Sequence, residues 1–216
     1  MKVFILILNY IDVVAPFVTL LFFIKPYRHL PKEVSYIFWF ILLQFSSNLL
    51  ATILEWFKVT NYLIYLSNII LSFFILSRMF YYMGNRLLKK LIPVGSLLFF
   101  VGILISLWYK DGIDSFNSNL SALGSFSITA YCLIFFYWRL VTDTRHTRLT
   151  ESSLLWMVIG IFTYYTGSFF IFISYQYLLV QEADVIGILW RFHNLLLAIF
   201  CAYTIYGITC KNYQKT

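Results

Sequence analysis

Seven polar side chains that could bind a ligand lie within long apolar stretches of this sequence. Ionisable groups are costly in such surroundings, so they usually face the interior of a helix bundle or a water-filled cavity. Carboxylates, a guanidinium, an imidazole and amides together could hold a small molecule by charge and hydrogen bonds. We predict that they form an outer polar cluster with a small-molecule ligand: Asp12, Asn48, Glu55, Asn68, Arg191, His193 and Asn194.

Polar residues recur at helical spacing, which places them on single helix faces. Three stripes follow this spacing: Gln44, Asn48, Thr52 and Glu55; Asn68 and Ser72; and Ser121, Ser125, Thr129 and Cys132. We expect the stripes to line a polar cavity that opens outward. Polar stripes and small residues such as Gly160 and Gly167 also hold membrane helices together. Packing alone, a ligand pocket and a path for an ion or solute therefore remain open.

Enzymatic chemistry has little support in the sequence. Ser168 and His193 fall at similar depth in the last two apolar stretches and could form a Ser/His dyad. However, Phe169 follows Ser168, so the Gly-x-Ser-Gly motif of rhomboid proteases is absent. The HExxH motif, a glycine-rich phosphate loop and a lysine in 185–209 that could bind retinal as in opsins are also absent. We predict no catalytic residues and no cofactor, and we expect that the chain is not an enzyme.

Metal and nucleic-acid binding are not expected either. Cys132, Cys201 and Cys210 lack the paired spacing of a disulfide framework or a zinc site, so we predict no metal. The formal net charge is +7, but the basic residues stand in short loops beside apolar stretches. That distribution is typical of membrane topology and not of a phosphate-binding face, so we predict no nucleic-acid partner.

The elements that must position these residues are membrane-spanning helices. The chain is 61% hydrophobic and 12% charged, whereas a soluble domain carries about 25% charged residues. About 20 apolar residues cross a bilayer as a helix, and a single helix satisfies its own backbone there. We predict an all-α polytopic protein, a single transmembrane domain over 1–216 in contact with the lipid bilayer. Its seven helices are expected at roughly 3–24, 34–57, 62–83, 91–109, 119–138, 153–177 and 185–209.

The basic residues also predict an orientation. Positive charges concentrate on the cytoplasmic side of membrane proteins. Eleven of the sixteen Lys and Arg residues fall on one predicted side: Lys25, Arg28, Lys32, Arg86, Lys89, Lys90, Arg139, Arg145, Arg148, Lys211 and Lys215. The N-terminus is therefore expected outside and the C-terminus in the cytoplasm. The first apolar stretch is too long for the core of a signal peptide, so we expect it to be retained.

The last third of the chain carries a resemblance to a family. It reads SLLWMVIGIFTYYTGSFFIFISYQYL and then LWRFHNLLLAIFCAYTIYGITC. This resembles small seven-span integral membrane proteins frequent in Bacteroidota, with the pattern W-x-x-x-N-x-x-x-N in the last span. Trp190 and Asn194 fit that pattern, and Ala198 replaces its later Asn. The preceding span is matched by Trp156, Gly160, Tyr164, Tyr165, Gly167, Phe169, Phe170 and Phe172.

The resemblance implies no established activity. Its members look like companions of membrane-associated histidine kinases, which implies a bacterial inner-membrane sensor or signalling adaptor with a kinase or another membrane protein as partner. We expect a receptor-like component, and a His193 that titrates near neutrality would add pH sensitivity. Two alternatives stay open. One is a small-solute transporter of 3+1+3 design, in which SNIILSFFIL aligns with HNLLLAIFCA. The other is a structural subunit of a membrane complex.

Overall fold

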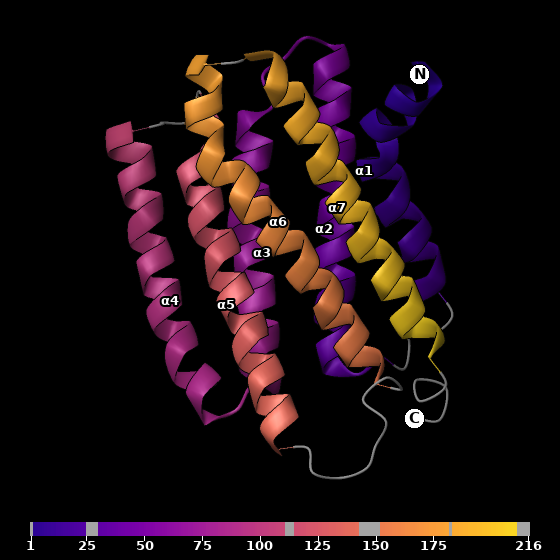
Figure 1. Cartoon of the computed structure of the whole chain (residues 1–216), viewed down its shortest axis with the longest axis vertical. Coiled ribbons are helices and arrows are strands. Elements are labelled where there is room, and N and C mark those ends of the chain that lie inside the picture. The colour runs from indigo at the N-terminus through magenta and orange to yellow at the C-terminus, as the bar shows by residue number, and fades with distance from the viewer. Residues whose placement is uncertain (1, 25–29, 111–114, 143–151, 182, 211–216) are drawn as a thin grey trace.

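The computed structural model describes residues 2–24, 30–110, 115–142, 152–181 and 183–210, and seven helices occupy most of these ranges (Figure 1). A π-helical turn, Ser106–Lys110, extends the fourth helix. The helices are α1 (Lys2–Phe23), α2 (Lys32–Trp56), α3 (Tyr62–Met83), α4 (Arg86–Ile105), α5 (Ser118–Thr142), α6 (Ser153–Gln181) and α7 (Ala183–Thr209).

The helices are those of a membrane protein. Six of them, α2 to α7, are long and apolar enough to cross a bilayer, and α1 adds a shorter apolar stretch over Tyr10–Phe23. Large apolar side chains are exposed on the outer surface, which suits contact with lipid. They include Phe17, Leu50, Phe74, Leu97, Leu98, Phe100, Phe126, Phe170, Ile173 and Tyr206. The predicted all-helical fold is confirmed, and its long apolar helices support a membrane protein.

Three helices extend four or five residues beyond the predicted spans: α4 at its start, and α5 and α6 at their ends. α4 begins at Arg86 and not at 91, because the side chain of Asn85 accepts a hydrogen bond from the Leu88 N–H at 2.9 Å. Such a cap satisfies a backbone donor that the first helical turn leaves without a partner. A search for apolar residues overlooks this start, because the first turn carries Arg86 and Lys89.

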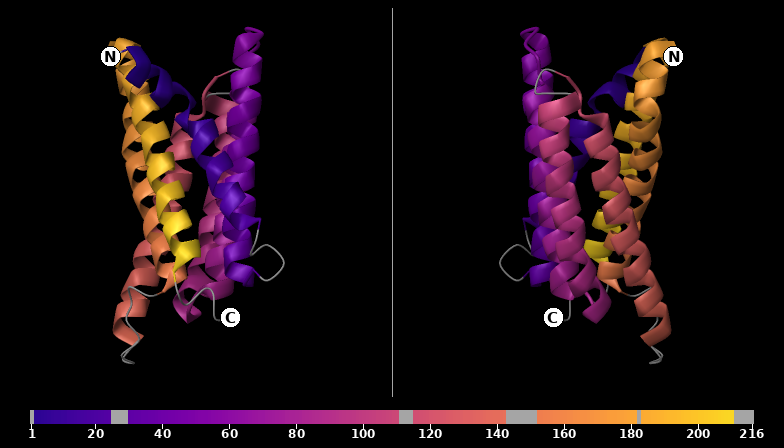
Figure 2. Two further views of the ribbon diagram at one scale, coloured as in Figure 1. Left: turned by 90° about the vertical axis from the view of Figure 1, so that its right-hand side faces the viewer. Right: turned by 90° about the vertical axis from the view of Figure 1, so that its left-hand side faces the viewer.

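Six helices form a closed ring, and the remaining helix, α4, lies outside it. α1 contacts α2, α2 contacts α3, α3 contacts α5, and the ring continues through α6 and α7 back to α1. α4 packs on the outside of α3 and α5, at the left edge of Figure 1. The ring diverges toward the end that holds the N-terminal end of α1, as both side views in Figure 2 show.

α6 and α7 pack closely because α6 lacks side chains at the contact. A Cβ atom added at Gly160 would lie 3.2 Å from the backbone oxygen of Phe200, and one at Gly167 would collide with Leu196. Small residues of this kind let two helix backbones approach in a membrane. The close-packing role expected for Gly160 and Gly167 is confirmed.

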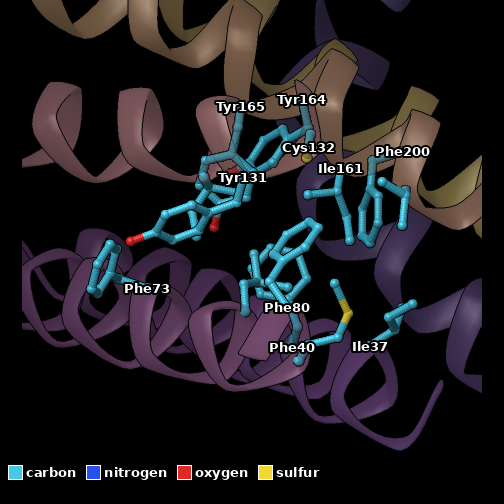
Figure 3. Close-up of a cluster of buried hydrophobic side chains, with 14 of the residues drawn as sticks. Ile37, Phe40, Phe73, Phe80, Tyr131, Cys132, Ile161, Tyr164, Tyr165 and Phe200 are labelled. Carbon is cyan, nitrogen blue, oxygen red and sulfur yellow. The ribbon is translucent and has the colours of Figure 1, made fainter. Parts of the chain in front are cut away.

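An apolar core fills the half of the ring away from the N-terminal end of α1. Ile37 and Phe40 stand near the start of α2, Phe80 near the end of α3, and Phe200 in the second half of α7. Since successive helices alternate in direction, these positions meet at one level (Figure 3). The Phe40 and Phe200 rings pack edge to face at 5.4 Å between centroids, a favoured aromatic geometry. This half is therefore closed by packed side chains.

Basic side chains mark the end beyond this core. Lys32 begins α2, Arg86, Lys89 and Lys90 lie in the first turns of α4, and Arg139 lies near the end of α5. The remaining residues used to predict the orientation lie outside the described residues: Lys25, Arg28, Arg145, Arg148, Lys211 and Lys215.

Candidate ligand-binding cavity

A cavity of about 650 Å³ occupies the half of the ring that the apolar core leaves open. All six ring helices contribute to its wall, and so does Phe116 in the segment before α5. Among the described residues, α4 contributes none. The structure brings the whole predicted cluster onto this wall: Asp12, Asn48, Glu55, Asn68, Arg191, His193 and Asn194. That these residues bind a ligand stays a prediction.

The cavity reaches the end of the bundle that holds the N-terminal end of α1. Glu55 and Trp56 at the end of α2, Tyr62 at the start of α3, and Gly187 in the second turn of α7 line it and are exposed. These residues form its mouth.

The opposite end of the cavity rests on the apolar core. Its buried lining residues there are Phe73, Tyr164, Tyr165 and Leu197. The Phe40 ring lies beneath both tyrosines, with centroid distances of 6.4 Å to Tyr164 and 6.1 Å to Tyr165 (Figure 3). This floor of tilted rings separates the cavity from the basic end.

Two of the three predicted stripes line the cavity in full, and the third does so in part. Gln44, Thr52 and Ser72 lie on the wall beside the predicted cluster, as do Ser121 and Ser125.

Thr129 and Cys132 are absent from the described lining, which corrects the expectation for the third stripe. Cys132 is fully buried in the core below, because α5 continues past the cavity into the packed half.

An amide network joins α2 to α3 within the wall. The Gln44 Nε2 group donates to Asn68 Oδ1 at 3.2 Å and to Ser72 Oγ at 2.9 Å. Asn68 Nδ2 donates back to Gln44 Oε1 at 3.2 Å. Ser72 Oγ also donates to Asn68 Oδ1, at 3.1 Å. Because these groups satisfy one another, they hold the wall in a fixed arrangement.

Asn48 joins α2 to α1 by replacing a missing backbone donor. In a helix, the Asp12 carbonyl would accept from the N–H of residue 16, but Pro16 has none. The Asn48 side chain donates to that carbonyl at 3.0 Å instead. Neighbouring helices often satisfy the backbone that a proline frees within a membrane. This contact gives Asn48 a structural role beside its place on the wall.

Asp12 brings a carboxylate into the bundle. Its Oδ1 atom is buried and has no hydrogen-bond partner among the described residues. The charge of Glu55 acts on the Asp12 carboxylate, and the charges of both act on the Tyr65 hydroxyl across the cavity. Arg191 brings a positive charge to the cavity lining, from α7.

His193 ties α7 to α6 through both ring nitrogens. Nδ1 lies 3.1 Å from Ser168 Oγ, and Nε2 lies 3.2 Å from the Tyr164 hydroxyl. A neutral imidazole has one donor and one acceptor nitrogen, and each hydroxyl can play the complementary part. A protonated ring would need both hydroxyls to accept. The pH sensitivity expected of His193 stays a prediction.

Ser168 and His193 have the side chains of a catalytic dyad, but their surroundings are those of a packing contact between helices. Ser168 is 1% exposed and lies in the middle of α6. The N–H groups of a helix interior are already bonded to carbonyls, so they cannot stabilise an oxyanion. We interpret the contact as a tie between helices, and the expected absence of enzymatic activity stays a prediction.

Aromatic side chains form a wall that the sequence did not reveal. We call Tyr65, Phe116, Phe172, Tyr175 and Trp190 the aromatic wall, and all five line the cavity. The rings of Tyr65 and Trp190 stack at 5.9 Å and 20°. The Phe116 ring meets Trp190 at 5.2 Å and Tyr175 at 5.1 Å, both edge to face. One signal was present for Tyr65, which lies three residues before Asn68 and so shares its helix face.

Comparisons of the chain with models of protein families, with curated proteins and with solved structures find no match.

Proposed function

We propose that the chain is a receptor-like membrane protein that binds a small molecule in its cavity and acts through a partner. The single observation that carries this proposal is a polar and aromatic cavity of about 650 Å³, open at one end and floored by a packed core at the other. Ligand sites typically have volumes of about 300 to 1,000 Å³, and they combine apolar walls with a few placed polar groups.

The shape of the wall suits a sensor. The ligand would touch α1, α2 and α3 on one side and α5, α6 and α7 on the other. A ligand shifts an equilibrium between two helix arrangements when it binds one of them better. Such a shift would reach the opposite end of α6 and α7 through their close packing. A partner at that end would receive the signal.

The proposal includes the orientation of the protein in the membrane and the kind of partner. The distribution of basic residues supports a cytoplasmic end at Lys32, Arg86 and Arg139, with the cavity mouth outside. The family resemblance of the last third supports a bacterial inner membrane and a histidine kinase as partner.

The test is ligand-dependent recovery of a partner. The tagged protein is purified gently from its native membrane with and without a compound that stabilises it against heat, and the co-purifying proteins are measured by mass spectrometry. We expect a signalling protein in near-equal amounts, with recovery that changes when the compound is present. Recovery of this chain alone under both conditions would contradict the proposal.

A second candidate, a small-solute transporter, is favoured by one observation. α4 lies outside the ring, so α1–α3 and α5–α7 form two three-helix halves around the cavity. Transporters built from repeats place their substrate between two such halves. Uptake of a stabilising compound into reconstituted vesicles would support the transporter, and binding without uptake would support the receptor.

A further inference from the structure

The cavity lining has two regions of different chemistry, and they point to a class of ligand. One region carries the carboxylates of Asp12 on α1 and Glu55 on α2. The other is the aromatic wall, from α3, the segment before α5, α6 and α7. We propose that the cavity binds an organic cation with an ammonium group, held by the carboxylates and the aromatic wall together. This inference rests on the proposed function, because it concerns the same cavity.

The cavity lining carries two carboxylates, Asp12 and Glu55, against one guanidinium, Arg191, so negative charge is in excess. A carboxylate within a helix bundle is costly unless a cation or hydrogen-bond donors compensate it. Asp12 Oδ1 is buried without a partner among the described residues. The charge of Glu55 adds repulsion at Asp12. An ammonium ion that enters by the mouth, where Glu55 is exposed, would relieve both costs.

The aromatic wall suits an ammonium group better than other cations. The face of a Trp or Tyr ring attracts a cation within about 6 Å of its centroid, and aromatic cages recognise quaternary ammonium groups. Tyr65 links the aromatic wall to the carboxylates. Its ring stacks on that of Trp190, and its hydroxyl interacts electrostatically with Asp12 and Glu55. A methylated ammonium group could therefore contact ring faces and carboxylates together.

A metal cation fits the cavity less well. Calcium takes 6 to 8 oxygen ligands at close range, and magnesium demands near-ideal octahedral geometry. The described residues contain no group of three or more His, Cys, Asp or Glu side chains able to hold a metal ion.

Arg191 and Asn194 indicate which second group the ligand carries. Both lie on the cavity wall from α7, one helical turn apart. A guanidinium repels a bare cation but holds a carboxylate, and an amide bonds either a carboxylate or a hydroxyl. Two classes of compound carry an ammonium group that would fit this lining: cationic amino alcohols and zwitterionic amino acid derivatives.

The test compares three compounds of similar shape on the purified full-length protein. Choline carries the cation, glycine betaine adds a carboxylate, and 3,3-dimethylbutan-1-ol is the neutral carbon analogue of choline. Binding is measured by calorimetry and by the shift of thermal unfolding. We expect choline or betaine to bind at least roughly tenfold more tightly than the neutral analogue, the scale of one desolvated cation–π contact. Tighter binding of betaine would assign Arg191 to the carboxylate.

Four variants localise the effect. We expect Asp12→Asn and Trp190→Leu each to weaken binding of the preferred ammonium compound by roughly tenfold. Glu33→Gln removes a carboxylate at the basic end, and Trp39→Leu removes an exposed indole outside the cavity. These two controls should bind as the parent does. The comparison of choline with its neutral analogue on the parent protein holds even if Asp12→Asn does not fold.

Two results would overturn the inference: equal affinity for choline and its neutral analogue, or no response of the folded protein to either ammonium compound. The proposed function fails separately. If only uncharged compounds stabilise the protein and change partner recovery, the receptor stands and the ammonium ligand falls. If an ammonium compound binds but partner recovery never responds, the ligand stands and the receptor falls.

Discussion

At the scale of single residues, the contact between Asn48 and the Asp12 carbonyl separates packing from binding. Asn48→Leu removes the donor that replaces the missing N–H of Pro16. Interhelical hydrogen bonds in membranes contribute about 0.6 kcal/mol on average and up to about 1.7 kcal/mol. We expect Asn48→Leu to lower the free energy of unfolding by about 1 to 2 kcal/mol, because it also leaves a carbonyl without a partner. Unfolding in mixed micelles would measure it.

Pro16→Ala supplies the matched background for that measurement. Alanine restores the helical N–H, so the Asp12 carbonyl keeps a partner when Asn48 is replaced. The cost of Asn48→Leu should then fall well below its cost in the parent. An equal cost in both backgrounds would show that Asn48 acts elsewhere.

Ser168 allows a sharp test of the expected absence of enzymatic activity. Its hydroxyl is hydrogen-bonded to His193, but the side chain is nearly inaccessible and lies within a helix. We expect no labelling by a serine-reactive fluorophosphonate, with a soluble serine hydrolase as the positive control. Labelling that is lost in Ser168→Ala would reverse the interpretation of the contact and make the dyad reactive.

The charged residues of the site could be predicted from the sequence, and the aromatic residues could not. Asp12 and Arg191 were identifiable because a charge in an apolar stretch has few places to go other than the bundle interior. Tyr65 and Phe116 were not, because aromatic residues in a membrane protein are equally suited to lipid contact. The hydrogen bond from Asn48 to the Asp12 carbonyl joins residues 36 positions apart in the chain, so only the fold reveals it.

At the scale of elements, two glycines test the packing of α6 and α7. A Cβ at Gly207 would lie 2.8 Å from the backbone oxygen of Ser153, which cannot rotate away. One at Gly167 would collide with the end of the Leu196 side chain, which can. We expect Gly207→Ala to destabilise the protein more than Gly167→Ala, as measured by thermal unfolding.

Gly187 is the control for that series. A Cβ there would meet nothing within 4 Å. Alanine in a helix is favoured over glycine by up to about 1 kcal/mol, so Gly187→Ala should be neutral or stabilising. If all three variants lost similar stability, close approach of α6 and α7 would not explain the effect of the added Cβ atoms.

The helices were predictable and their arrangement was not. Long apolar stretches located α2 to α7 within a few residues, because the length of a membrane span is set by the bilayer. The start of α4 was missed because it depends on the Asn85 cap. The position of α4 outside the ring depends on side-chain packing with α3 and α5, which hydropathy does not encode.

At the scale of the whole molecule, the chain combines a polar half and an apolar half, and orientation decides which side of the membrane the cavity serves. Single cysteines can test the orientation in a background where Cys132, Cys201 and Cys210 are replaced. Thr60→Cys lies in the exposed loop between α2 and α3, near the cavity mouth, and Lys90→Cys lies at the basic end. Both residues are exposed, so neither change should disturb the core of the ring.

The positive-inside rule gives the expected result. A membrane-impermeant maleimide should label Thr60→Cys in intact cells, and it should label Lys90→Cys only after the membrane is made permeable. That outcome would open the cavity to compounds outside the cell and leave the basic end for a cytoplasmic partner. The reverse pattern would point the mouth at the cytoplasm. A receptor for external compounds would then be excluded, whereas the ammonium site itself would remain open to cytoplasmic ligands.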